Sequence, residues 1–311
     1  MCCSGPVFHD VGFMNWLLAS LVAAAFLGVY ELCTKHAVRA NAVLPVLFLA
    51  TLCSAATWTL LLGVQRLAPG LLPAVLSVDP LTFAQHLQLF LKSAIVTGAW
   101  VCTYFAVKHL PVSISSPVAS TQPLVTLAGG LLLFSERPSP LQMVGITVTL
   151  ASFIGLSFAG RAEGVDFKRN GWIRLLVAGT AFNALSALYD KHLLGRAHFS
   201  AATVQAWFSI YLALLFLPMA AGWKQRWWPR GEFHWRWTIP GLAASLLVAD
   251  FIYFSALRDP SALISVVSCI RRGSVLISFT GGLLLLGETN GRRKLPAMLG
   301  MLGGIWLIML G

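Results

Sequence analysis

The chain has 311 residues, 57% of them hydrophobic and only 11% charged, and its formal net charge is +11. This composition is too apolar for a soluble domain of that length, and it excludes a soluble nucleic-acid-binding protein as the explanation of the basic excess. Apolar stretches of about 20 residues, the length that crosses a hydrocarbon core, recur along almost the whole sequence. We therefore predict a multi-pass integral membrane protein whose partners are the lipid bilayer and a small molecule, with no nucleic acid.

Helices are the expected spanning elements, because every backbone polar group in lipid must be hydrogen bonded within its own segment. No stretch between the apolar segments is long enough for a soluble domain, so function has to reside inside an all-α bundle. We predict ten spans, in chain order Trp16–Thr34, Val43–Val64, Leu89–Val107, Val112–Phe134, Leu141–Ala159, Trp172–Leu194, Ala202–Gly222, Thr238–Leu257, Ala262–Leu286 and Leu295–Leu310.

An internal repeat is visible in three short matches. "GGLLLFSE" (129–136) and "GGLLLLGE" (281–288) share six of eight positions and lie 152 residues apart. "YFAVKHLP" (104–111) similarly matches "YFSALRDP" (253–260), and a Lys-His pair ends both the first and the sixth span. Each copy would hold five spans, an odd number, so the second copy enters the membrane from the opposite side. Inverted repeats of this kind build a central cavity, although a duplicated bundle can also be a scaffold or an enzyme subunit.

The fourth span, "SPVASTQPLVTLAGGLLLFSE", the following "QMVG", and the ninth span, "IRRGSVLISFTGGLLLLGE", resemble the two EamA modules of the drug/metabolite transporter superfamily. This resemblance implies ten helices in two inverted-topology five-helix modules. The expected division is a tail at 1–15, a first module at 16–160, a connecting loop at 161–171 and a second module at 172–311. Proteins of this family move amino acids, sugars, nucleotide sugars, drugs or other metabolites, so the resemblance does not identify the substrate.

The distribution of Lys and Arg predicts the orientation. Six of these residues fall on the face that holds both termini, namely Arg66, Lys92, Arg137, Lys191, Arg196 and Arg258, whereas fourteen fall on the other face. The positive-inside rule therefore places both termini outside. Carriers that resemble this chain are more usually drawn with their termini inside, so the two arguments conflict.

Two adjacent arginines, Arg271 and Arg272, lie deep in the ninth span. An arginine that faced lipid at that depth would cost at least ~2.5 kcal/mol, so at least one must face protein or water. Asp250, at a matching depth in the eighth span, can pair with only one of them, because adjacent helical residues point about 100° apart. The other guanidinium either meets cargo or is held structurally by helix carbonyls, Ser268 or Ser274. An unbalanced charge of +1 predicts a substrate with a carboxylate, a phosphate or both signs of charge.

Further polar and aromatic residues at depth either line a cavity or pack between helices. They are Gln122, between two prolines, and Asn183, Trp100, Tyr104 and Tyr253. The carboxylates nearer the span ends have simpler interpretations. Glu31 precedes Lys35 by four residues, the favoured order for an ion pair on one helix. Glu136 and Glu288 are expected to cap the start of the following helix, which leaves Asp250 as the only deep carboxylate.

We predict from these features a secondary transporter that moves a small organic metabolite by alternating access, in a bacterial inner membrane. The sequence contains no HExxH, paired intramembrane carboxylates, Asp-rich metal motif or Gly-rich phosphate loop, which disfavours a membrane enzyme of lipid or isoprenoid chemistry. Six cysteines without metal-ligand spacing predict no metal, and no cofactor is expected. A non-catalytic membrane subunit or a lipid-carrier flippase component remains an alternative. The substrate, the direction of transport, the coupling ion and the oligomeric state are left open.

Overall fold

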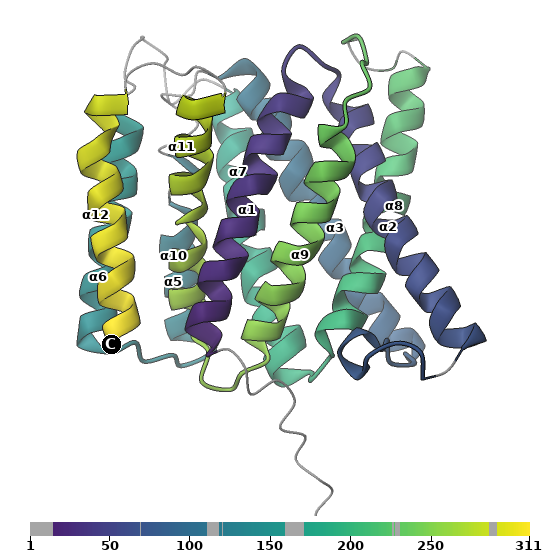
Figure 1. The fold of residues 1–311 in the computed structure, drawn as a ribbon, viewed down its shortest axis with the longest axis horizontal. Coiled ribbons are helices and arrows are strands. Elements are labelled where there is room, and N and C mark those ends of the chain that lie inside the picture. The colour runs from purple at the N-terminus through teal and green to yellow at the C-terminus, as the bar shows by residue number, and fades with distance from the viewer. Residues whose placement is uncertain are drawn as a thin grey trace, which may run out of the picture.

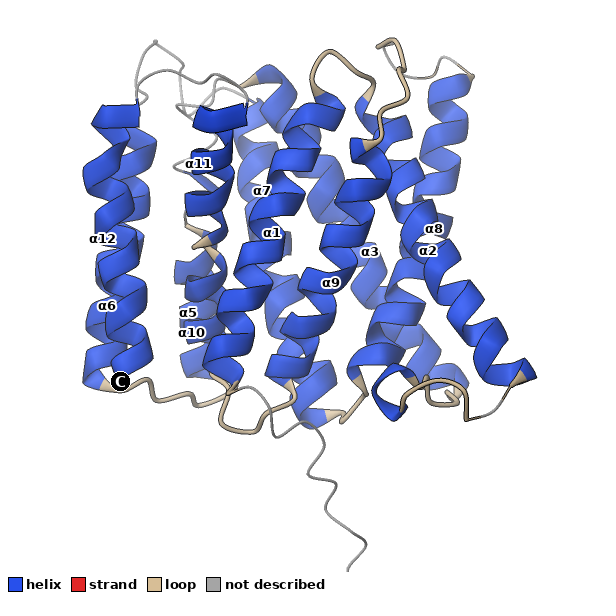
Figure 2. Cartoon of the chain, viewed as in Figure 1, coloured by secondary structure: helices blue, strands red, loops and turns tan. Residues whose placement is uncertain are grey.

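A computed structural model of the chain describes residues 15–68, 70–110, 118–119, 121–158, 171–225, 227, 231–285 and 291–311. Within these ranges all regular structure is helical, which confirms the all-α prediction (Figure 2). The helices are α1 (Trp16–Val38), α2 (Val43–Leu67), η1 (Ala74–Leu76), α3 (Phe83–His109), α5 (Gln122–Leu133), α6 (Pro140–Phe158), α7 (Gly171–Lys191), η2 (His192–Arg196), α8 (Ala201–Lys224), α9 (Thr238–Leu257), α10 (Ile264–Arg271), α11 (Ser274–Leu285) and α12 (Gly291–Leu310).

Six helical segments of the described chain are long and apolar enough to cross a membrane. They are Trp16–Val38, Val43–Leu67, Phe83–Ala106, Gly171–Arg196, Ala201–Lys224 and Thr238–Leu257, and shorter apolar helices occupy Gln122–Leu133, Pro140–Gly155 and Leu295–Leu310. The helices stand side by side, roughly parallel, as expected for a bundle that crosses a bilayer (Figure 1).

The predicted ninth span, Ala262–Leu286, is not one continuous helix. α10 ends at Arg271, and the amide groups of Arg272 and Gly273 donate to the carbonyls of Cys269 and Ile270, at 3.0 and 2.8 Å. These i→i+3 bonds tighten the last turn before α11 begins in the same column (Figure 1). The prediction of an unbroken span was therefore wrong, because apolar composition reports that a segment can cross the membrane and not that its backbone is continuous.

α3 begins at Phe83, six residues before the predicted start of the third span at Leu89. A capping box fixes this start: the Thr82 hydroxyl accepts from the Gln85 amide, and the Gln85 side chain accepts from the Thr82 amide at 2.8 Å. Two orphan backbone donors are satisfied in this way. The earlier start moves every residue of α3 deeper into its helix than the apolar window suggests.

The most extensive helix contacts join α1 with α9, α6 with α12, α3 with α7, and α2 with α8. Small residues permit the close approach of α6 and α12, which form one side of the molecule (Figure 1). A Cβ atom added at Gly304 would lie 2.3 Å from the Thr149 hydroxyl and 2.8 Å from the Gly145 carbonyl oxygen. Glycine at this position therefore lets the two backbones touch, as is common between membrane helices.

The start of α1 and the C-terminus lie on the same face of the bundle (Figure 1). Two of the six basic residues that the sequence assigned to this face belong elsewhere, since the Lys92 and Lys191 side chains are buried, 2% and 9% exposed. Four remain, namely Arg66, Arg137, Arg196 and Arg258, so the excess of positive charge on the opposite face is larger than the sequence alone indicated.

This stronger asymmetry gives a testable prediction of orientation. A reporter fused after Gly311 should be active only outside the cytoplasm, and one inserted at Gly164 should be active only inside it, because basic loops are retained in the cytoplasm. A pair of reporters with complementary compartment requirements at each site supplies the control. A cytoplasmic C-terminus would contradict the charge argument in favour of the usual orientation of similar carriers.

Candidate functional site

A cavity of about 230 Å³ lies at the centre of the bundle, between α1, α3, α5, α7, α8, α9 and the junction of α10 with α11. The structure brings seven of the eight predicted site residues to its wall. They are Arg271, Arg272, Asp250, Tyr253, Gln122, Asn183 and Trp100. The eighth residue, Tyr104, is not part of this wall. Its hydroxyl is a hydrogen-bond partner of Tyr30, and Tyr30 is part of the wall.

Arg271 is the arginine that pairs with Asp250. Its guanidinium lies 3.1 Å from the Asp250 carboxylate and over the Tyr253 ring, with 3.9 Å between the guanidinium carbon and the ring centroid. Both partners are largely buried, at 20% and 15% side-chain exposure. The ring face is attractive to a cation, so Tyr253 is a second partner of the guanidinium beside the carboxylate.

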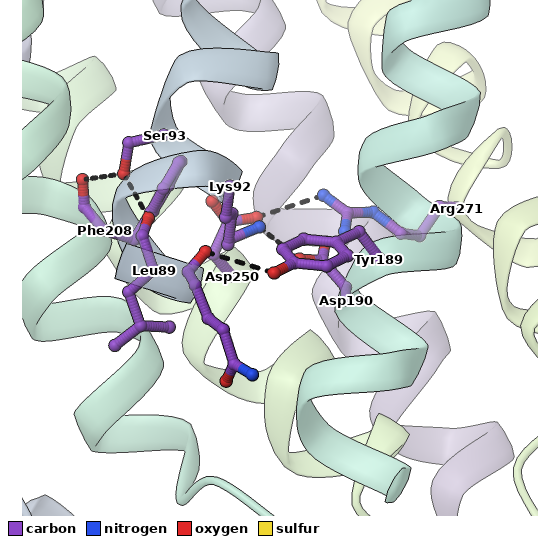
Figure 3. A network of polar contacts seen from close by, with 9 residues as sticks. Leu89, Lys92, Ser93, Tyr189, Asp190, Phe208, Asp250 and Arg271 are labelled. Carbon is purple, nitrogen blue, oxygen red and sulfur yellow. Dashed lines mark hydrogen bonds and ion pairs between the residues drawn. The ribbon is translucent and has the colours of Figure 1, made fainter. Parts of the chain in front are cut away.

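A second ion pair, which the sequence interpretation missed, joins Lys92 of α3 to Asp190 of α7 (Figure 3). Its side chains are even less exposed, at 2% and 6%. The Lys92 ammonium also lies 4.5 and 4.9 Å from the ring centroids of Phe208 and Phe254. Asp190 interacts electrostatically with the neighbouring pair, so the two ion pairs form one cluster of four side chains from α3, α7, α9 and α10.

Arg272 has a different environment from Arg271. Its guanidinium donates to the side-chain oxygen of Gln122, at the first residue of α5. Glu31 lies nearby in the cavity wall, where its carboxylate accepts from the Ser274 hydroxyl at 2.7 Å. Neither Glu31 nor Arg272 forms an ion pair within the described part of the chain.

The expected charge of +1 in the cavity is corrected by these observations. Its wall carries three cations, Lys92, Arg271 and Arg272, and three carboxylates, Glu31, Asp190 and Asp250, so the formal charges balance. Asp250 is not the only deep carboxylate. Glu31, which the sequence placed at a span end beside Lys35, is bonded to Ser274 inside the cavity.

Two of the remaining predicted residues combine packing with a place in the wall. The Asn183 amide donates to the Gly179 carbonyl of its own helix at 3.0 Å, and the Trp100 ring lies 5.9 Å from the Phe216 ring. The interpretations as cavity lining and as interhelical packing therefore both apply to Trp100. Asn183 uses its donor within α7 and exposes the rest of its side chain to the cavity.

Glu136 caps a helix, but not the one that follows it. Its carboxylate accepts from the amides of Ile264 and Ser265, at 2.5 and 3.1 Å, and from the Ser265 hydroxyl at 2.7 Å. These groups form the start of α10, 128 residues further along the chain. Glu136 thus stabilises the N-terminal end of the helix whose other end carries the two arginines. Glu288 lies outside the described residues.

A second cavity, of about 850 Å³, lies at the face opposite the termini, among the end of α3, the start of α2 and the end of α8. Tyr104, Phe105 and His109 contribute to its wall. On the side of the termini, by contrast, buried apolar residues close the bundle beneath the charged cavity, including Leu193, Leu257 and Ile264. The two sides of the central cavity are therefore unequal in this conformation.

The fold and this cavity define a multi-pass helical membrane protein with a charged interior. Residues 14–158 match the EamA-like transporter family. The match identifies residues 14–158 as similar to an EamA-like module, in agreement with the resemblance seen in the sequence. The chain is also similar to a known crystal structure, with a TM-score of 0.65 and 17% identity over 95% of both chains, a likeness of fold alone. Comparison with curated protein sequences gave no match.

Proposed function

We propose that the protein is a secondary transporter of a small organic metabolite in a bacterial inner membrane, and that its substrate binds in the central charged cavity. The observation that carries this proposal is the central cavity itself, whose wall holds six charged side chains from five helices. Ionisable groups at such depth are costly and mark substrate or ion pathways. A carboxylate-, phosphate- or zwitterion-bearing substrate fits this wall better than a purely apolar one.

We further propose that ten spans form two inverted five-helix repeats. The offset of 152 residues relates α5 (Gln122–Leu133) to α11 (Ser274–Leu285), two helices of identical length, residue for residue. The contacts also come in pairs that such a repeat would relate: α1 with α9 and α7 with α3, or α1 with α11 and α7 with α5. In the proposed repeat, α2 corresponds to α8 and α6 corresponds to α12. Each of these helices contacts its own counterpart, as expected for helices beside a pseudo-two-fold axis.

Alternating access follows from this architecture as the proposed mechanism. The two repeats can rock against each other around the central site, so that the cavity faces one side of the membrane at a time. The larger cavity on the face opposite the termini and the apolar closure on the other face support a conformation with access from one side.

Uptake into liposomes tests the proposal. Purified protein reconstituted into liposomes should accumulate or exchange at least one solute from a panel of labelled carboxylates, phosphates and zwitterions, whereas empty liposomes should not. Simple cations, added to the panel for comparison, should not be moved, because they cannot accept from the Arg272 guanidinium, whose described partner is the neutral Gln122. If no solute is moved, but labelled lipid changes leaflet, the protein is a flippase component; if neither moves, a non-catalytic subunit is favoured.

A further inference from the structure

We infer that the substrate is a zwitterion, with its carboxylate bound by Arg272 and its cationic group bound by Glu31. This inference rests on the proposed transport function and narrows the substrate class. Four of the six charged side chains in the cavity wall form ion pairs with each other. The inference comes from the other two, Glu31 and Arg272, which form no ion pair among the described residues.

Two of the three cations are already neutralised by protein carboxylates. Arg271 is 3.1 Å from Asp250, and Lys92 is paired with Asp190. Each pair is also flanked by an aromatic ring, Tyr253 for Arg271 and Phe254 for Lys92. A ligand that used either cation would first have to separate a buried ion pair and leave its carboxylate uncompensated, which is strongly unfavourable.

The remaining two charged side chains are those of Arg272 and Glu31. Among the described residues, their hydrogen-bond partners are all neutral. Arg272 donates to the amide oxygen of Gln122, and Glu31 accepts from the hydroxyl of Ser274. Both lie in the wall of the same cavity, and within the described residues they form no ion pair. A ligand carboxylate offers Arg272 the same planar oxygen acceptor as the Gln122 amide, but with a charge, and can accept two parallel bonds.

A ligand with both signs of charge satisfies both positions at once. A lone carboxylate at Arg272 would lie close to the Glu31 carboxylate, and a lone ammonium at Glu31 would lie close to Arg272. Either ligand adds a repulsive neighbour, and a like charge at close range opposes binding in a site with little water. A bound zwitterion instead places its cationic group at Glu31 and its carboxylate at Arg272, so that opposite charges meet at both contacts. The formal charge of the cavity then stays at zero.

The available space restricts this ligand to a small one. A volume of 230 Å³ is below the roughly 300–1,000 Å³ of typical ligand pockets, so the central cavity fits a small solute better than a large conjugate. Leu27, Val96 and Trp100 supply apolar wall beside the polar groups, against which an uncharged side chain of the ligand can pack.

Matched sets of three ligands test the inference on the wild-type protein. Each set contains an amino acid, the amine that lacks its carboxylate and the acid that lacks its ammonium, and the sets place one, three or five carbons between the two charges. Thermal stabilisation of the detergent-purified protein gives an apparent affinity for every member. In at least one set the amino acid should bind ~10- to 100-fold more tightly than both of its relatives, as expected for loss of one charge-assisted hydrogen bond.

Two variants assign the two ends. Glu31→Gln should reduce the affinity for the amino acid to about that of its acid, and Arg272→Gln should reduce it to about that of its amine. Arg258→Gln, an exposed residue at the end of α9, is the matched control and should bind like the wild type. The comparison of ligands on the wild type decides the question even where a variant does not fold.

The outcomes separate the inference from the transport function. Uptake of simple acids or simple amines with affinities equal to those of the amino acids would overturn the zwitterion while leaving the protein a transporter. Absence of binding by every member of every set would likewise overturn it, even if liposomes accumulate another class of solute. Only the absence of any solute uptake would contradict the proposed function itself.

Discussion

Replacing Lys92 with Met, or Asp190 with Leu, should sharply reduce the amount of folded protein recovered from the membrane. Each single change leaves one buried charge without its partner, at a cost of about 3–5 kcal/mol. The two side chains are the least exposed ion pair of the described chain, at 2% and 6%. The measurement is the yield and melting temperature of the detergent-extracted protein, with Arg258→Gln, an exposed charge, as the control.

The double variant of Lys92 and Asp190 should recover most of the lost stability, because apolar residues of similar volume can replace a buried ion pair at little cost. Its transport should nevertheless change. Lys92 ties α3 to α7, and by the proposed repeat these helices belong to different modules. Full stability in both single variants would contradict this reasoning, as would a double variant no more stable than either of them.

This ion pair lies on the side of the cavity that is closed. Lys92 is about 14 Å along α3 from its start at Phe83, and Asp190 is near the end of α7, so both approach the central cavity from the face of the termini. Opening that face by moving α3 relative to α7 must break the pair. The ion pair therefore favours the conformation seen here, and the proposed alternating access requires this contact to be exchanged for others.

The deep charges of the C-terminal half stood out in the sequence because their signal was strong. Arg271, Arg272 and Asp250 are charges within otherwise apolar runs, and the structure places all three on one cavity wall. The repeat offset of 152 residues also relates α5 to α11. These features depend on local composition and spacing, which are visible without coordinates.

Lys92, Asp190 and Glu31 were misjudged because each lies within about four residues of an end of its predicted span, where a charge is expected to reach the membrane surface. The capped α3 starts six residues before the predicted span, and α1 continues to Val38, so Lys92 and Glu31 lie further from the helix ends than the apolar windows indicated. A capping box at Thr82 was the available signal for α3; the partner of a buried charge, by contrast, depends on tertiary packing.

The two arginines should differ in what their loss does. Asp250→Asn and Arg271→Ala should each reduce folded protein, since either change separates a largely buried ion pair, and the double variant should recover much of the yield. Arg272→Ala should leave the yield near that of the wild type, because its described partner is the neutral Gln122, and should abolish uptake. Fluorescence-detected gel filtration measures the yield, and liposome uptake measures the activity.

The structure thereby assigns roles that the sequence left interchangeable. Arg271 points to Asp250 from the last turn of α10, whereas Arg272 follows as the capping residue and reaches α5. A one-residue difference at the break between α10 and α11 therefore separates a guanidinium that is paired with a carboxylate from one whose described partner is neutral. Equal yield and equal uptake in Asp250→Asn, Arg271→Ala and Arg272→Ala would remove the basis for both assignments, while loss of yield in Arg272→Ala alone would reverse them.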